Sequence, residues 1–282
     1  MPGGFPLLGD VCNGQSVGTN IASSDGTTLT SGGANTKGSW VQLISSTAAD
    51  CVLAYITAAY NSSADGSDQC SASIDIGIGG AGSEVVLVQD LLIGPEYTQQ
   101  SGIELVIPLN IPVGTRVSAR CQTSSTTAGA NTCLIALTLF DGSFAQGEGA
   151  SGVDALGFVS STTKGAAILP SATVDTFGSY VTVIASTAKD YTGIFGLFEN
   201  RAGQLATAQS YLLSVAIGAA ASENDIIPTK LIRGGVSGAV ARPTAIIPYL
   251  PIAIPSGTRL SARCMCSSAS GRTQGLSLYG VY

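Results

Sequence analysis

Two copies of one arginine-bearing segment are the strongest candidates for chemistry in this chain. IPVGTRVSARC at residues 111–121 returns as IPSGTRLSARC at residues 254–264, with nine of eleven positions identical. Alternate side chains of a strand point to opposite faces, so the two arginines of each segment share one face, about 7 Å apart. The Val/Leu-Ala-Cys set on the other face belongs to a core.

Guanidinium groups bind carboxylates through paired hydrogen bonds, so these arginines indicate a contact surface for carboxylates of a neighbouring subunit or of the same domain. A solvated sheet face with edge-protecting charge is the alternative. The two glutamates that recur in both halves are the acids suited to pair with arginine. The candidate interface residues are Arg116, Arg120, Arg259, Arg263, Glu84 and Glu223.

Acid–base catalysis by paired carboxylates is the other chemistry to consider. The chain has no histidine, which excludes Ser-His-Asp and Cys-His arrangements. A carboxylate-pair hydrolase needs two acids placed together, yet Asp75 aligns with Ser214 in the second half. We therefore expect solvated or turn carboxylates and no enzyme activity. The acids covered by this expectation are Asp75, Glu84, Asp90, Glu96 and Glu104.

The seven cysteines form no CxxC pair, so the sequence predicts neither a zinc site nor any other cofactor. Free cysteine behaves as a small buried hydrophobe, and we expect most of these thiols in the core. Cys121 and Cys133 flank one loop and could face each other across a hairpin. The strand opposite Cys264 carries no cysteine, which argues against a structural disulfide.

Charge is sparse and unevenly divided. Only 11% of the 282 residues are charged, which predicts that other subunits cover much of the surface. Residues 1–145 hold three basic and eleven acidic residues, a net of −8, and the remainder holds nine basic and seven acidic, a net of +2. No run of basic residues is present to bind nucleic acid, and no apolar run is long enough for a membrane-spanning helix. The opening MPGGFPLLGDVCNGQ lacks the basic region of a secretory signal.

Paired segments in a constant order predict an internal duplication. GSWVQLISSTAAD matches GSYVTVIASTAKD, and IDIGIGGAGSE matches LSVAIGAAASE. The glycine-rich segment is predicted to be a tight corner, because a phosphate loop would need a lysine and a following helix. Short Val/Ile/Thr-rich runs with a period of two predict an all-β chain of two tandem antiparallel β-sandwich domains, jelly-roll or immunoglobulin-like. Residues 201–222 favour helix by composition, but their alignment with a strand of the first copy predicts strand.

We expect an N-terminal arm at 1–20, a first domain at 21–144, a linker at 145–159 and a second domain at 160–282.

The string GSWVQLISSTAAD…IDIGIGGAGSEVV…LLIG…IPLNIPVGTRVSARCQ resembles a module that recurs in virion proteins of tailed bacteriophages. These modules are small β-sandwich domains of capsid decoration, tail and fibre components. The resemblance implies a structural protein without catalytic residues, assembled into the virion in the host cytoplasm. It also implies other virion subunits as partners and a homo-oligomer, a trimer being the form that suits threefold capsid sites.

Capsid decoration is the function that we expect, because an adhesin would expose more aromatic residues than the 6% present here. A tail or fibre component that binds a host surface is the first alternative. A carbohydrate-binding module or a carboxylate hydrolase is a more remote alternative.

Overall fold

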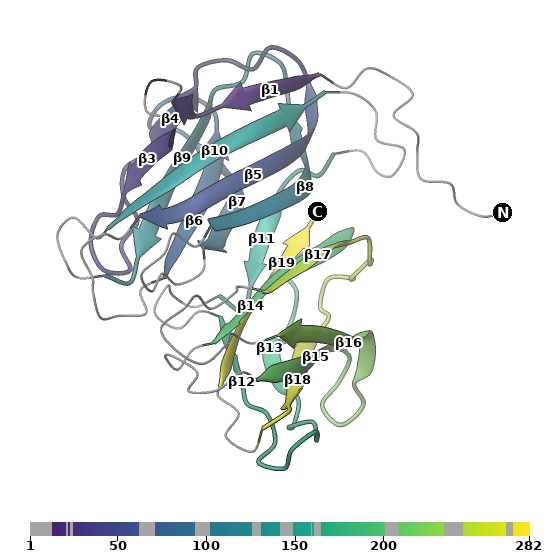
Figure 1. The fold of residues 1–282 in the computed structure, drawn as a ribbon. Coiled ribbons are helices and arrows are strands. Elements are labelled where there is room, and N and C mark those ends of the chain that lie inside the picture. Colours follow the sequence, from purple (N-terminus) through teal and green to yellow (C-terminus); the bar gives the residue numbers. More distant parts are fainter. Residues whose placement is uncertain are drawn as a thin grey trace.

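The computed structural model is built from β-strands, and the described residues contain no helix (Figure 1). The structure describes residues 13–20, 22, 25–61, 71–93, 102–125, 131–141, 149–158, 160, 165–200, 209–233, 245–268 and 273–282. No helix long and apolar enough to cross a membrane occurs in these ranges.

The strands form three sheets. The first has the order β2-β3-β10-β5-β8, with β1 also paired to β10. Its members are β1 (Gly14–Val17), β2 (Thr19–Asn20), β3 (Asp25–Thr30), β5 (Cys51–Asn61), β8 (Gly102–Ile111) and β10 (Thr132–Phe140).

The second sheet crosses from one half of the chain to the other, in the order β17-β14-β19-β11-β7-β6-β9-β4, with β12 paired to β19. Its members are β4 (Val41–Ile44), β6 (Ala72–Ile78), β7 (Val85–Ile93), β9 (Val117–Thr123), β11 (Val153–Leu156), β12 (Ala166–Ile168), β14 (Gly193–Asn200), β17 (Ala245–Leu250) and β19 (Gln274–Val281). The third sheet has the order β13-β18-β15-β16. Its members are β13 (Val181–Ile184), β15 (Ser210–Ile217), β16 (Asn224–Arg233) and β18 (Leu260–Cys266).

Two apolar cores lie between these sheets. The first core joins residues of β5, β8 and β10 to residues of β6, β7 and β9, and the second joins β14 and β19 to β15 and β18. Strand β8 shows the alternation that builds such a core, because Ile103, Leu105 and Ile107 are buried while Glu104 and Val106 are exposed. The period-two pattern therefore identified core residues directly from the sequence.

Strands of the two halves pair in the same registers. Ser73 of β6 lies opposite Leu92 of β7, and their aligned positions Leu212 and Leu231 lie opposite each other on β15 and β16. Both pairs of strands also shift register at two matching places. The pairing of β4 with β9 likewise repeats in the pairing of β13 with β18, and in both the register shifts after the first two paired residues.

Strands β1 and β11 extend this correspondence beyond the boundaries expected from the sequence. Strand β1, within the predicted arm, pairs with the end of β10, and β11, within the predicted linker, pairs with the end of β19. Each is followed by a glycine in the left-handed region, Gly18 at φ 75° and Gly157 at φ 78°. The segment 153–156 is thus an ordered strand of the second sheet, with Val153 and Leu156 buried.

The two corners that resemble each other in sequence also share their backbone shape. Gly79 and Gly218 have φ of 111° and 113°, and Gly82 at φ 82° corresponds to Ala221 at φ 64°. The tight-corner prediction for GIGGAGS is confirmed. The strand prediction for residues 201–222 is confirmed at β15, and residues 201–208 lie outside the described residues.

Candidate functional site

Arg116 anchors the first of two arginine clusters, and it binds inside its own chain. Its guanidinium donates to Oε1 of Glu84 at 2.8 Å, to the carbonyl of Gly79 at 3.2 Å and to Gln42 at 3.0 Å. Glu84 follows the tight corner, so this arginine fixes the corner to β4 and β9. Burial opposes ionisation of Glu84, but hydrogen bonds from Arg116 and from backbone amides outweigh it and lower the pKa of this carboxyl.

Arg259 repeats these contacts in the second half. It donates to Oε1 of Glu223 at 3.1 Å, to the carbonyl of Gly218 at 3.1 Å and to Thr182 at 3.1 Å. Burial opposes ionisation of Glu223, and the backbone and arginine hydrogen bonds lower its pKa overall. Each of these two arginines therefore has the role of holding one corner against the neighbouring strands.

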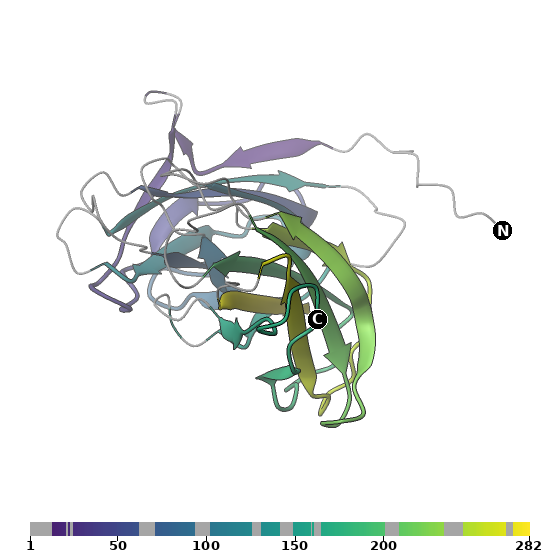
Figure 2. The same ribbon diagram turned by 60° about the horizontal axis from the view of Figure 1, so that its bottom comes forward.

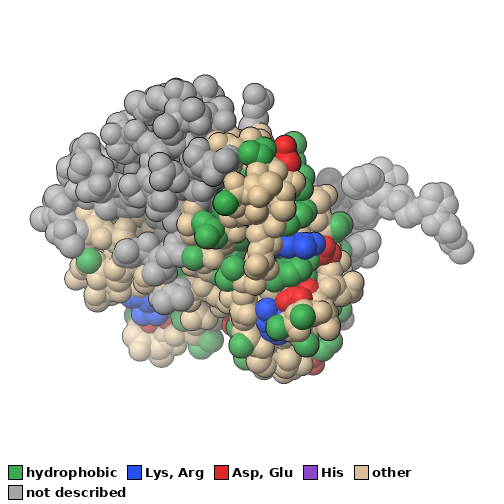
Figure 3. Space-filling model, turned by 90° about the horizontal axis from the view of Figure 1, so that it is seen from below, with side chains coloured by type: hydrophobic (Ala, Val, Ile, Leu, Met, Phe, Trp, Pro, Cys, Tyr) green, Lys and Arg blue, Asp and Glu red, His purple; other side chains and the backbone are tan. Residues whose placement is uncertain are grey.

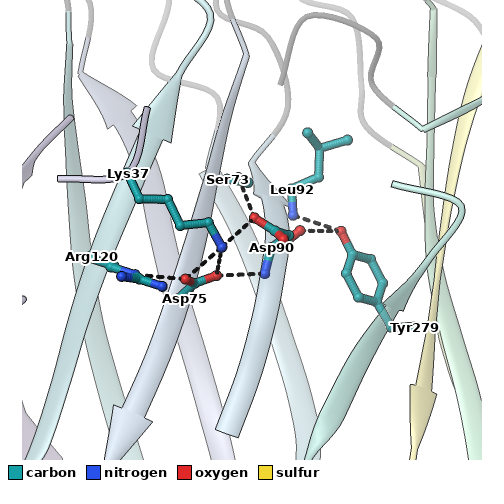
Figure 4. Close-up of polar contacts among 7 residues, drawn as sticks. All are labelled: Lys37, Ser73, Asp75, Asp90, Leu92, Arg120 and Tyr279. Carbon is teal, nitrogen blue, oxygen red and sulfur yellow. Dashed lines mark hydrogen bonds and ion pairs between the residues drawn. The ribbon is translucent and has the colours of Figure 1, made fainter. Parts of the chain in front are cut away.

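Arg120 completes the first cluster together with Lys37, Asp75 and Asp90 (Figure 4). The carboxylate of Asp75 lies 2.8 Å from Nε of Arg120 and 2.7 Å from Nζ of Lys37, and its side chain has no exposed surface. Lys37 also lies 2.9 Å from Oδ1 of Asp90. The backbone amide of Asp90 donates to Asp75 at 2.9 Å. Two cations thus neutralise two buried carboxylates.

The phenol of Tyr279 links this cluster to the second half of the chain (Figure 4). Its hydroxyl donates to the carbonyl of Asp90 at 3.0 Å and accepts from the amide of Leu92 at 2.8 Å. The ring stacks on Phe195 of β14 with a centroid separation of 4.8 Å. Strand β7 is therefore held at Asp90 and Leu92 by a side chain of β19, whose ring packs on β14.

Arg263 corresponds to Arg120 but takes its carboxylate from a different strand. Its partner is Asp225 of β16 at 3.3 Å, while Ser214 occupies the place of Asp75 and donates to the same carboxylate. Tyr180 also donates to Asp225. Burial opposes ionisation of Asp225, and the hydrogen bonds from Ser214, Tyr180 and Arg263 lower its pKa overall.

An aromatic ring covers the second guanidinium of each motif. Trp40 lies 4.4 Å from Arg120, and Tyr180 lies 4.3 Å from Arg263, both measured to the ring centroid. Ser118, between the two arginines of the first motif, has no exposed surface. The alternative of a solvated polar face on these strands is therefore wrong, because aromatic rings, Lys37 and carboxylates cover it.

The other acids considered from the sequence have different positions. The expectation of a solvated or turn position was wrong for Asp75 and Asp90, which are buried strand residues held by cations and amides. Glu104 is exposed on β8, as expected, and its hydrogen bond to Tyr55 raises the pKa of that phenol. Glu96 lies outside the described residues. The interface assignment of the four arginines and two glutamates stays a prediction, and each has an intramolecular partner.

The described cysteines are free and buried, as the sequence predicted. Burial, reinforced by a hydrogen bond to Cys121, raises the pKa of Cys133 well above its usual value. Burial also raises the pKa of Cys264 to about 12. The described residues hold no group of His, Cys, Asp and Glu that could bind a metal ion.

Sequence reasoning missed Lys37, Asp225 and Tyr279. The exchange of Asp75 for Ser214 looked like a lost acid, and only the pairing of β15 with β16 shows that Asp225 supplies the carboxylate from the adjacent strand. Asp225 aligns with Val86 on β7, so a position-by-position comparison gives no signal for it. Tyr180 could be found, since it aligns with Trp40.

No protein-family model matches the chain, and neither does any curated protein. Among solved structures, the chain is similar to PNGF-II, with a TM-score of 0.39 and 8% identity, covering 95% of this chain and 65% of that one. It is also similar to a triple jelly-roll protein of the turret assembly of an archaeal virus, with a TM-score of 0.23, 9% identity, and coverage of 97% and 59%. The corresponding values for tripeptidyl peptidase 2 are 0.26, 7%, 96% and 23%. The chain thus spans less than two thirds of each of these proteins.

Proposed function

We propose that the chain consists of two copies of one β-sandwich domain. The first copy begins with β1 and ends with β10, and the second begins with β11 and ends with β19. The matching registers of β6–β7 and β15–β16 support this proposal. The equivalent ion pairs of Arg116 with Glu84 and of Arg259 with Glu223 support it as well. The domain boundaries then fall near residues 13 and 152, since β1 and β11 become equivalent first strands.

We further propose that the protein is a structural component of a bacteriophage virion and decorates the capsid. The observation that carries this proposal is the internal use of charge. In the described residues the candidate arginines, the buried carboxylates and Lys37 bind one another, which leaves a surface of few charges for contact with other subunits. On the face seen in Figure 3, blue and red side chains lie in small adjacent groups among hydrophobic and uncharged atoms.

Exposed apolar side chains add to this surface. Assembly proteins bury such residues against neighbours, and the area removed from water stabilises the particle. Among the residues that the structure describes, the exposed large apolar side chains are Val85, Val106, Val113, Leu169, Val174 and Leu231.

The test is the copy number of the chain in purified virions, measured by quantitative mass spectrometry against the major capsid protein. Decoration predicts a constant ratio of this chain to the major capsid protein, with copies over the whole capsid. It also predicts density for the chain on the outer surface of the capsid in a reconstruction. A number that matches only the symmetry of the tail would replace decoration with the tail or fibre role. Absence of the chain from the particle would contradict the virion proposal altogether.

A further inference from the structure

We propose that the chain binds a second copy of itself head to tail, with β1 of one molecule lying along the outer edge of β16 of the next. The inference goes beyond the virion role. It rests on the duplication proposed above and does not depend on where in a particle the protein is placed.

The proposed contact copies one that already exists inside the chain, where strands of the two halves meet at β11. Strand β11 pairs with β19 on one edge and, in parallel, with β7 on the other, where Val153 lies opposite Val88. Ala155 of β11 packs against the first core. These contacts merge strands from both halves into one sheet, as Figure 1 shows between the upper and lower parts of the molecule.

In the part of the chain that the structure describes, the equivalent edges at the two ends have no partner strand. Strand β1 pairs with β10 as β11 pairs with β19, and β16 pairs with β15 as β7 pairs with β6. Among the described residues no strand pairs with the outer edge of β1 or of β16. Strands β1 and β16 lie at opposite ends of the molecule in Figures 1 and 2, so one molecule cannot close this contact on itself.

Each of these edges exposes a position that its counterpart covers at least in part. Leu92 of β7 has no exposed surface, whereas Leu231, at the same register on β16, is 65% exposed. Leu231 lies opposite Leu212 on the next strand, and Leu212 lies opposite Met265 on the strand after that. These three residues help to line a shallow cavity of about 210 Å³. On the other edge, Ser16 of β1 is exposed, whereas Ala155 in the matching position of β11 is packed.

Charge favours the same orientation. A head-to-tail contact brings the half with a net charge of −8 against the half with a net charge of +2. A contact between two first halves would instead place two strongly acidic surfaces together, and a contact between two second halves would gain no attraction from their net charge. Because the two contacting surfaces differ, the association extends until it closes as a ring or grows as a filament.

Sedimentation velocity of the purified chain over a range of concentrations tests the proposal. We expect the mean mass to rise with concentration in low salt, and to rise less at high salt because screening weakens the charge attraction. Leu231→Asp at the β16 edge and Ser16→Lys at the β1 edge should each weaken self-association about tenfold or more. Leu169→Asp is the matched control, since Leu169 is 57% exposed elsewhere on the surface, and it should associate like the wild type.

Mixing the two blocked variants separates this contact from a symmetric one. Each variant keeps one intact edge, so an equimolar mixture should form a heterodimer and grow no further. A monomeric wild type at all concentrations, or self-association of Leu231→Asp equal to that of the wild type, would overturn the proposal. A mixture of the two variants that stays monomeric would also overturn it. None of these outcomes bears on whether the chain is found in virions.

Discussion

Nε of Arg120 lies 2.8 Å from Oδ2 of Asp75, a carboxylate whose side chain has no exposed surface. A buried carboxylate is tolerated only when cations and hydrogen-bond donors replace the water that it loses. Lys37 and the amide of Asp90 supply the remaining contacts. The interaction therefore stabilises the fold: without Arg120 the buried Asp75 carboxylate loses a counter-charge, and without Asp75 the partly buried guanidinium loses its acceptor.

Asp75→Asn should destabilise the protein by about 3 kcal/mol, because Arg120 and Lys37 would lose the carboxylate that compensates their partial burial. Urea unfolding followed by tryptophan fluorescence measures this change, since Trp40 lies over Arg120. Glu104→Gln is the control, and its exposed position predicts a change within about 0.5 kcal/mol. Equal effects of the two substitutions would show that the cluster contributes nothing specific.

The second cluster predicts a rescue. Asp225→Val copies the valine found at the aligned position of β7 and should cost about 1–2 kcal/mol, because Arg263, Tyr180 and Ser214 lose their shared acceptor. Adding Ser214→Asp returns a carboxylate to the place that Asp75 has in the first half. A double-mutant cycle should give a favourable coupling of about 1 kcal/mol. Additive effects would mean that the two strand positions are not interchangeable.

The sequence predicted the all-β class, the buried faces and the tight corners well, because period-two alternation and glycine placement are local signals. The partners of the arginines were less accessible, because they depend on which strands lie side by side. Asp75 reaches Arg120 from β6, and Asp225 reaches Arg263 from β16. The junction at β11 was hidden for a related reason, since four residues among glycines and serines resemble a linker until both neighbouring strands are known.

Ala221→Gly should stabilise the protein by about 1 kcal/mol, because Ala221 has φ of 64° where the equivalent corner has Gly82. The melting temperature should rise by about 2 °C. Gly82→Ala should lower stability by a similar amount, since its added Cβ meets no atom and only the backbone conformation is penalised. Changes of the same sign in both variants would contradict this account.

The described cysteines should be unreactive in the folded protein. Thiolate is the reactive form, and burial raises the pKa of Cys51, Cys133 and Cys264. Cys12 and Cys70 lie outside the described residues, so the test uses a Cys12→Ser/Cys70→Ser variant. We expect no labelling by an aromatic disulfide at pH 8 in native buffer, and labelling of all five remaining thiols in denaturant. Rapid native labelling of any of the five would contradict their burial.

Acid should destabilise the fold through the two corner glutamates and Asp225. Their pKa values in the folded protein are lowered below the ordinary values near 4. As pH falls, the unfolded chain takes up these protons before the folded protein does, so stability falls with pH through this window. The urea midpoint should be nearly constant between about pH 5.5 and 7 and drop below about pH 4.

A Glu84→Gln/Glu223→Gln variant isolates the contribution of the two corners to this pH dependence. Glutamine keeps the shape of the side chain and can still accept a hydrogen bond from Arg116 or Arg259, but it takes up no proton. The variant should be less stable than the wild type at pH 7 and should lose less stability between about pH 5 and 3, because two of the linked protonations are gone. Glu104→Gln, a substitution of the same kind at an exposed carboxylate away from both corners, is the control. If the double variant and the wild type lost the same stability between about pH 5 and 3, the ion pairs of Arg116 with Glu84 and of Arg259 with Glu223 would not couple protonation to folding.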